Sequence, residues 1–156
     1  AQLWVVAAGQ SDHVARCAPL FEAVGRGVSV AGTEPCAANV VKLAGNFLII
    51  AVIEAMGEAF ALARASGIDA RELLEVANNA LFQSPLYANY GGIIAEKRFE
   101  PAGFRLGLAL KDARLVSAAA DAAHVPMPLA SLVHDRLIRA VADGHGEIDW
   151  AAFSSL

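Results

Sequence analysis

Apolar residues follow two different patterns along this chain. Near the start, two short apolar runs, Leu3–Ala8 and Val28–Ala31, flank a segment whose apolar residues recur at helical spacing. A short apolar run bounded by glycine is typical of a buried strand. The intervening helix is expected to begin after Ser11 or Asp12, which can cap it, and to end at Gly25. The first part of the chain is therefore predicted to fold as strand, helix and strand.

From Gly32 onward, the pattern predicts only helices. Cap residues and prolines mark where these helices begin, and glycines or prolines mark where they end. Asp69 and Glu72 have the spacing of a capping box at one such start. The predicted helices cover residues 35–66, 69–80, 84–97, 104–123 and 128–143. Asp149 is expected to cap a final short turn.

The two patterns divide the chain into two predicted domains. A pair of parallel strands needs neighbouring strands and cover on both faces. Residues 1–33 are therefore predicted to be the tail end of an α/β domain. Residues 34–156 are predicted to form an all-α domain, so the fold class is mainly α, a helical bundle preceded by a strand-helix-strand segment.

Composition narrows the classes of function. The 156 residues are 56% hydrophobic and 18% charged, which is enough apolar material to fill a core and argues against disorder. The net charge of −4 leaves no basic stripe to neutralise phosphates, so we predict no nucleic-acid partner. The four histidines are scattered without metal-ligand spacing, and we predict no metal site.

Compartment and membrane contact are also addressed by the sequence. The apolar run Phe47–Met56 is interrupted by Glu54 and is shorter than the roughly 20 residues that span a bilayer. No basic segment followed by a cleavage site is present. Cys17 and Cys36 lack the spacing of a redox or metal motif and are interpreted as free thiols. We predict a cytoplasmic protein without a membrane partner.

Lys42 and Asn46 are the first candidates for chemistry. They lie in the most apolar predicted helix, where a lysine is unusual because burying an ammonium without a partner is costly. A separation of four residues places the amine and the amide on one helical face, within reach of a common ligand.

These residues, with others, resemble a known family. The lysine followed by asparagine four residues later, and the later phenylalanine and Lys-Asp pair at Phe104 and Lys111-Asp112, are similar to motifs of the β-hydroxyacid dehydrogenases. That family includes 3-hydroxyisobutyrate dehydrogenase and tartronate semialdehyde reductase, and it is related to 6-phosphogluconate dehydrogenase. The resemblance implies the end of a Rossmann-type dinucleotide-binding domain, followed by the family's helical C-terminal domain.

The chain also departs from the family pattern. Two glycines usually precede the lysine, where this chain has Cys36 and Ala38, and a paired asparagine usually stands where it has Gly45-Asn46. No GxGxxG fingerprint for a pyrophosphate is present. The resemblance therefore implies that NAD or NADP is bound mainly by an upstream domain that this sequence lacks, so this segment alone is expected to be inactive.

The resemblance further implies roles for four residues. Lys42 would be the proton donor or acceptor, activated by burial and by a second cation such as Lys111. Asn46 would bind substrate, and Lys111 would lie beside the substrate carboxylate or the nicotinamide. Phe104 would form a wall of the nicotinamide pocket. The expected reaction is NAD(P)-dependent interconversion of a short-chain hydroxy acid and its semialdehyde or keto form.

Other interpretations stay open at this stage. Lys42 fits a snorkelling lysine, Asn46 a structural amide, and Lys111-Asp112 a solvated pair. The helical part could be a dimerisation or substrate-binding module with degenerate catalysis. An imine-reductase-like enzyme is a further alternative, disfavoured because those proteins generally lack a lysine at this position. The helix 35–66 is apolar on more than one side, which predicts a homodimer or higher homo-oligomer.

Overall fold

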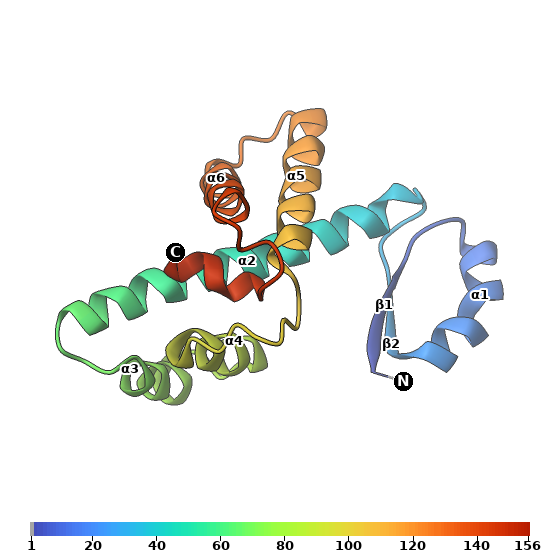
Figure 1. The fold of residues 1–156 in the computed structure, drawn as a ribbon. Coiled ribbons are helices and arrows are strands. Elements are labelled where there is room, and N and C mark those ends of the chain that lie inside the picture. The colour runs from blue at the N-terminus through green and yellow to red at the C-terminus, as the bar shows by residue number, and fades with distance from the viewer. Residues whose placement is uncertain (1) are drawn as a thin grey trace. The chain divides into compact units, whose positions relative to one another are not determined.

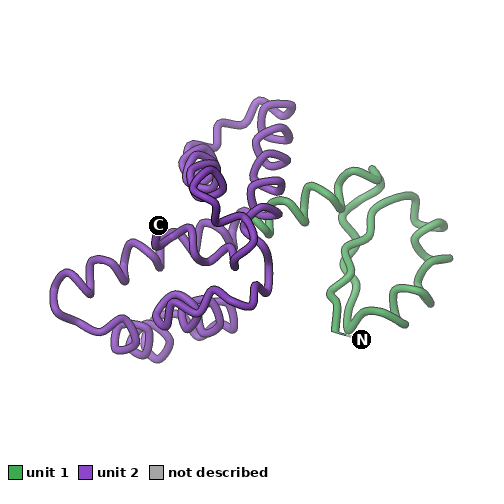
Figure 2. The backbone as a smooth tube through the Cα atoms, in the orientation of Figure 1, with its two compact units in different colours: residues 1–46 green, residues 47–156 purple. Residues whose placement is uncertain are grey.

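The computed structural model describes residues 2–156, which form two compact units (Figure 2). The first unit ends at Asn46 and the second begins at Phe47. The division falls inside one long helix, α2 (Cys36–Ala65), which therefore contributes to both units. The domain boundary predicted between residues 33 and 34 rests on the sequence pattern alone and stays a prediction.

The first unit has the predicted strand-helix-strand order. β1 (Leu3–Ala7) and β2 (Gly25–Val30) pair in parallel, and α1 (Ser11–Val24) connects them (Figure 1). β2 begins at Gly25 rather than at the predicted Val28. The reason is space, because a Cβ on Gly25 would lie 2.9 Å from a Val5 methyl and one on Gly27 would lie 2.5 Å from the Trp4 ring.

The regular elements of the second unit are all helices, as predicted. After α2, the elements are α3 (Ala70–Val76), the π-helical turn η1 (Ala77–Leu81), α4 (Pro85–Glu96), α5 (Leu106–Ala123), α6 (Pro128–Ala142) and the 3₁₀ helix η2 (Trp150–Ser155). In Figure 1, α3 and α4 lie on one side of α2, and α5 and α6 lie on the other.

Two helix boundaries differ from the prediction. The helix expected to end near Ala80 changes to π geometry at Ala77, and the Phe82 N–H bonds to the Ala77 carbonyl at 2.7 Å. Paired asparagines are poor α-helix formers, which is consistent with the change. α5 begins at Leu106 instead of Phe104, because the Phe104 backbone is hydrogen-bonded to residues of the C-terminal segment.

The core of the second unit forms around the later part of α2. That helix contributes a stripe of fully or nearly fully buried side chains, Ile50, Ile53, Met56 and Phe60. Gly57 lies on the same helix, where η2 approaches so closely that a Cβ would fall 2.4 Å from Ser154. The absence of a side chain at residue 57 therefore sets how closely η2 packs on α2.

An ion pair is buried in the same region. Glu54 is only 3% exposed, and Arg136 of α6 donates to its Oε1. The other end of the Arg136 guanidinium donates to the Phe153 carbonyl at 3.4 Å. Burial raises the pKa of Glu54, and the positive charge of Arg136 opposes that rise. The pair joins α2, α6 and η2.

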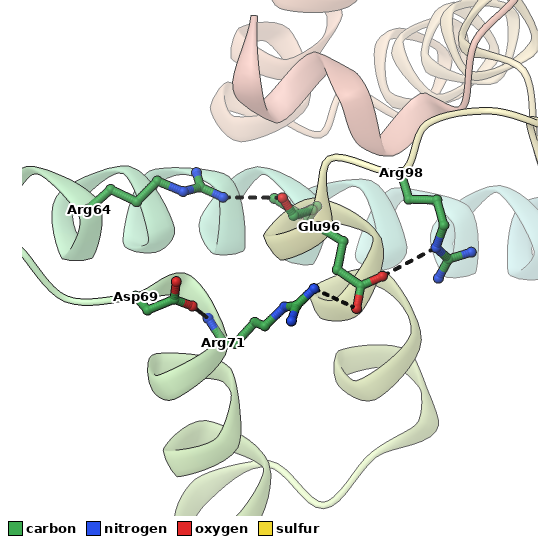
Figure 3. Close-up of polar contacts among 6 residues, drawn as sticks. Arg64, Asp69, Arg71, Glu96 and Arg98 are labelled. Atoms are coloured by element: carbon green, nitrogen blue, oxygen red, sulfur yellow. Dashed lines mark hydrogen bonds and ion pairs between the residues drawn. The ribbon is translucent and has the colours of Figure 1, made fainter.

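Polar contacts also join α2, α3 and α4 (Figure 3). Arg64 donates to the Ile94 carbonyl at 3.2 Å, near the C-terminal end of α4, where this carbonyl also accepts from the Lys97 N–H at 3.3 Å. Glu96 accepts from Arg98 at 3.3 Å and pairs with Arg71 of α3 at 3.5 Å. These exposed pairs each contribute little to stability, and they link the end of α4 to α3.

Within residues 2–156, α2 is the one helix long and apolar enough to cross a membrane by length and composition. A single helix of this kind is weak evidence, because a core helix of a soluble protein passes the same test. The later part of α2 buries Ile53 and Phe60 in the protein core, and it carries the buried Glu54. The prediction that this chain has no membrane partner stays a prediction.

Candidate cofactor and substrate site

Lys42 and Asn46 lie one turn apart on α2, in the part that belongs to the first unit. Lys42 is exposed and Asn46 is half-buried. Lys42 is predicted from the sequence to be buried, and the structure shows that this prediction is wrong. No residue of α2 between 36 and 47 is buried, so apolar neighbours in sequence do not provide an apolar environment in space.

A cleft of about 530 Å³ opens in the first unit, between the carboxyl end of β1 and α1. Its wall includes Gly9, His13, Cys17 and Glu34. None of the four residues given a role from the sequence lines this cleft. Size alone therefore does not make it the site of the expected chemistry.

Phe104 lies in the second unit, two residues before α5 begins. Its ring packs edge-on against Trp150, with centroids 4.7 Å apart and an interplanar angle of 63°. The rest of the side chain is only partly buried, and it lines a pocket of about 340 Å³. Gly103, Gly107 and Gly146 line the same pocket, together with the larger side chains of Arg105, Leu108 and Glu147.

Lys111 and Asp112 are brought together on α5. The Lys111 Nζ lies 2.8 Å from Asp112 Oδ1, although neighbouring helical residues usually point apart. The Lys111 side chain is 57% exposed, whereas Asp112 is 1% exposed. The alternative of a solvated pair therefore holds for the lysine only. The Lys111 side chain is therefore largely exposed, while its ammonium is paired with a buried carboxylate.

Asp149 and Trp150 hold the backbone that carries Phe104. Asp149 Oδ2 accepts from the Gly103 N–H at 2.9 Å and from the Phe104 N–H at 3.1 Å. The Trp150 N–H donates to the Phe104 carbonyl at 2.8 Å, and the Leu106 N–H donates to the Ile148 carbonyl at 2.9 Å. The start of α5 and its phenylalanine are thus fixed by the C-terminal segment.

Tyr90 of α4 completes the aromatic cluster. Its ring meets Trp150 edge-on, with centroids 5.7 Å apart. Burial raises the pKa of the Tyr90 hydroxyl, and the negative charge of Asp149 adds to the rise. Tyr90 and Phe104 therefore pack against the same buried indole, and α4 supports the loop from the other side.

Comparison with known proteins identifies the family of this chain. A family model described as "NAD-binding of NADP-dependent 3-hydroxyisobutyrate dehydrogenase" matches residues 36–156. The chain belongs to this family. Membership confirms the resemblance drawn from Lys42, Asn46, Phe104 and Lys111, and it confirms a nicotinamide dinucleotide as the class of cofactor.

Individual relatives agree with the family. The chain is 38% identical over 152 residues to the uncharacterized oxidoreductase YfjR of Bacillus subtilis, covering 97% of this chain and 53% of that protein. It is 32% identical over 151 residues to L-threonate dehydrogenase of Escherichia coli K12, with 97% and 50% covered. A solved 3-hydroxyisobutyrate dehydrogenase from Salmonella typhimurium superposes with a TM-score of 0.84 at 27% identity, over 94% of this chain and 51% of that one.

Two facts follow from these matches for this member of the 3-hydroxyisobutyrate dehydrogenase family. The predicted fold class, a helical bundle after a short strand-helix-strand segment, is confirmed. The chain spans about half the length of the relatives it matches, so half of a relative has no counterpart here.

The surroundings of Phe104 fit the nicotinamide end of such a cofactor. The Phe104 ring packs edge-on against Trp150, beside a pocket with three glycines in its wall, where a planar group can approach the backbone. The Lys111 ammonium, which is paired with Asp112 on a largely exposed side chain, could also bind an anionic group or a carbonyl oxygen. Within residues 2–156, no cluster of three or more His, Cys, Asp or Glu side chains has metal-binding geometry.

Sequence reasoning missed the supporting residues of this site. Asp149 was expected only as a helix cap, a role that it has, since its Oδ1 accepts from the Ala151 N–H at 2.9 Å. Nothing in the spacing indicated that its second oxygen reaches residues 103 and 104. A tryptophan directly after a cap, near the end of a helical domain, was the available signal for a buried anchor.

Proposed function

We propose that the complete protein containing this chain is an NAD(P)-dependent oxidoreductase. It would interconvert a short-chain 3-hydroxy acid, or a 2-hydroxy-3-oxo acid or other semialdehyde, with its carbonyl form. The observation that carries the proposal is the joint presence of Lys42, Asn46, Phe104 and Lys111 in the segment matched by the family. The names of the relatives, which include L-threonate dehydrogenase and glyoxylate/succinic semialdehyde reductase, support this substrate class.

Lys42 is the proposed proton donor and acceptor. Reduction of the carbonyl needs a hydride at carbon and a proton at oxygen. Bound nicotinamide supplies the hydride, and it takes the hydride back in the reverse direction. The Lys42 ammonium polarises the carbonyl and donates the proton to its oxygen. During oxidation the neutral amine accepts the hydroxyl proton.

The other three residues position the reactants. Asn46, on the same face of α2, hydrogen-bonds the substrate or orients the Lys42 amine toward the substrate oxygen. Lys111, whose ammonium is paired with Asp112, binds the substrate carboxylate or the cofactor amide. Phe104 forms a wall against the nicotinamide ring, and Trp150 supports it.

Replacing Lys42 with Met in the full-length protein tests the proposal. We expect kcat on the accepted hydroxy acid to fall by about 10²–10⁴, the usual contribution of a positioned acid or base, with little change in the Kd for NAD(P)H. Lys97→Met is the matched control, because it removes a lysine charge that has no proposed role. Activity is read on a panel of hydroxy acids with NAD and with NADP.

Two outcomes would contradict the proposal. Unchanged kcat in Lys42→Met would remove the assigned role of the lysine. A folded wild-type protein that binds NAD(P)H but turns over no hydroxy acid or semialdehyde would favour a binding or dimerisation module with degenerate catalysis.

A homo-oligomer in the cytoplasm is part of the same proposal. α2 exposes large apolar side chains at Val40, Val41, Leu48 and Leu62. Such side chains are commonly covered by a second copy in symmetric oligomers. Sedimentation of the full-length protein should show a dimer or larger species at micromolar concentration, and a monomer there would refute it.

A further inference from the structure

Asp149 is bonded more extensively than a helix cap requires. The carboxylate is 3% exposed, and both of its oxygens accept backbone hydrogen bonds. Oδ1 caps η2 through the Ala151 N–H at 2.9 Å. Oδ2 accepts from the Gly103 N–H at 2.9 Å and from the Phe104 N–H at 3.1 Å, across more than forty residues of sequence. Hydrogen bonds to a buried charged acceptor are among the stronger ones in proteins.

The contacts around Asp149 leave the Phe104 backbone little freedom. The Phe104 N–H is bound by the carboxylate, and its carbonyl accepts from the Trp150 N–H at 2.8 Å. The Asp149 N–H in turn donates to the Phe99 carbonyl at 2.9 Å, at the other end of the same loop. With both backbone polar groups held, the start of the Phe104 side chain is fixed, and the ring packs edge-on against the Trp150 indole.

We propose that Asp149 is a positioning residue for the nicotinamide end of the cofactor pocket, and that it acts through Phe104. It contacts neither cofactor nor substrate in this assignment. Its carboxylate holds the Gly103–Phe104 backbone so that the phenyl ring forms a fixed wall. The inference rests on the proposed function, since it assumes that Phe104 faces the nicotinamide.

Asp69 provides a natural comparison on the same chain. It also caps a helix, with Oδ1 accepting from the Arg71 N–H at 2.7 Å, but it is exposed and lies at the start of α3. Substituting Asn at each position leaves one oxygen to serve as the cap. At residue 149 the substitution also turns an amide NH₂ toward the Gly103 and Phe104 donors, which then lack an acceptor.

The experiment uses the full-length protein and separates the two ends of the cofactor. Binding of NADH and NADPH is titrated by nicotinamide fluorescence, and binding of ADP-ribose and its 2′-phosphate by calorimetry. Asp149→Asn and Phe104→Leu should each weaken binding of the preferred reduced cofactor about two- to tenfold, the range expected for losing one aromatic contact. Binding of the ADP-ribose ligands, which lack nicotinamide, should not change.

Two further variants make the result specific. The double variant Asp149→Asn/Phe104→Leu should bind no more weakly than Phe104→Leu alone, because both changes remove the same wall. Asp69→Asn should bind like wild type. Asp149→Ser keeps an oxygen that can cap η2 and removes the second acceptor. It replaces Asp149→Asn in the binding experiment if that variant does not fold.

The outcomes distinguish the inference from the proposed function. If Phe104→Leu weakens NAD(P)H binding and the Asp149 variants do not, the inference is wrong and the role of Phe104 stands. Equal weakening of ADP-ribose and NAD(P)H in Asp149→Asn would show a general loss of structure and would overturn it as well. If Phe104→Leu binds like wild type, both the phenylalanine wall and its positioning residue are refuted, while the role of Lys42 is tested separately.

Discussion

Replacing Gly57 with Ala tests whether the close contact between η2 and α2 depends on the absence of a side chain at residue 57. A Cβ at this position would lie 2.4 Å from both the Cβ and the carbonyl oxygen of Ser154, and 2.7 Å from its Oγ. The two elements would have to separate by about 1 Å to restore ordinary contact. Ser154 has little room to yield, because its Oγ donates to the Ala151 carbonyl at 2.9 Å and the neighbouring Phe153 is buried.

Two energies of opposite sign determine the result. Alanine is a better helix former than glycine by roughly 0.5–1 kcal/mol. Overpacking against a backbone that cannot move costs about 1–3 kcal/mol. We therefore expect Gly57→Ala to lower the free energy of local unfolding around residues 50–60 by about 1–2 kcal/mol. Gly45→Ala is the matched control on the same helix, since a Cβ at residue 45 would have no atom of another segment within 4 Å.

Amide hydrogen exchange of residues 50–60 in the full-length protein measures this free energy directly. Exchange should be faster in Gly57→Ala and the same or slower in Gly45→Ala. Gly91→Ala should lie between them, because its Cβ would meet only the end of the flexible Leu74 side chain, at 2.3 Å. Equal changes in Gly57→Ala and Gly45→Ala would refute the claim that this contact limits the packing.

Three further predictions concern the core and its ion pair. Arg136→Met leaves the Glu54 carboxylate buried without its cation, so the free energy of unfolding at neutral pH should fall by about 3–5 kcal/mol, and by less near pH 4. Burial raises the folded-state pKa of Glu54 above its ordinary 4.5, so wild type should lose stability relative to Glu54→Gln as pH rises through that folded-state pKa, and regain it as pH falls toward 4.5. Ile53→Ala should cost about 2–5 kcal/mol, because the side chain is fully buried.

Urea unfolding across a pH series checks all three. Leu132→Ala, on α6 and 48% exposed, is the control for Ile53→Ala and should change stability by less than about 0.5 kcal/mol. A loss in Arg136→Met that is independent of pH would contradict an uncompensated carboxylate. A wild-type stability that rises with pH relative to Glu54→Gln would reverse the sign of the assigned pKa shift.

Local signals accounted for most of the secondary structure. Asp69 and Asp149 are predicted as caps, and in the structure each accepts a hydrogen bond from the backbone N–H two residues later. Ser84, at the start of the predicted helix 84–97, does the same. Caps, prolines and hydrophobic periodicity act within one or two helical turns. The position of a helix can therefore be predicted from residues close together in the sequence. The Lys42–Asn46 spacing belongs to the same class, because one helical turn determines it.

Contacts between distant segments decided the rest. β2 extends back to Gly25 because Val5 and Trp4 of β1 leave room only for glycines. α5 starts late because Asp149 holds the Phe104 backbone. In both cases the deciding partner lies twenty or more residues away, where sequence spacing carries no information.

The sequence by itself determined the helices, the strand-helix-strand segment and a set of residues that identifies the family. It did not determine the environment of any of those residues. Lys42 is surrounded by apolar residues in the sequence and is exposed. Glu54 has similarly apolar sequence neighbours and is buried. The physical reason is that burial depends on what packs against a helical face. Only the tertiary structure brings Arg136 to Glu54 and Asp149 to the loop of Phe104.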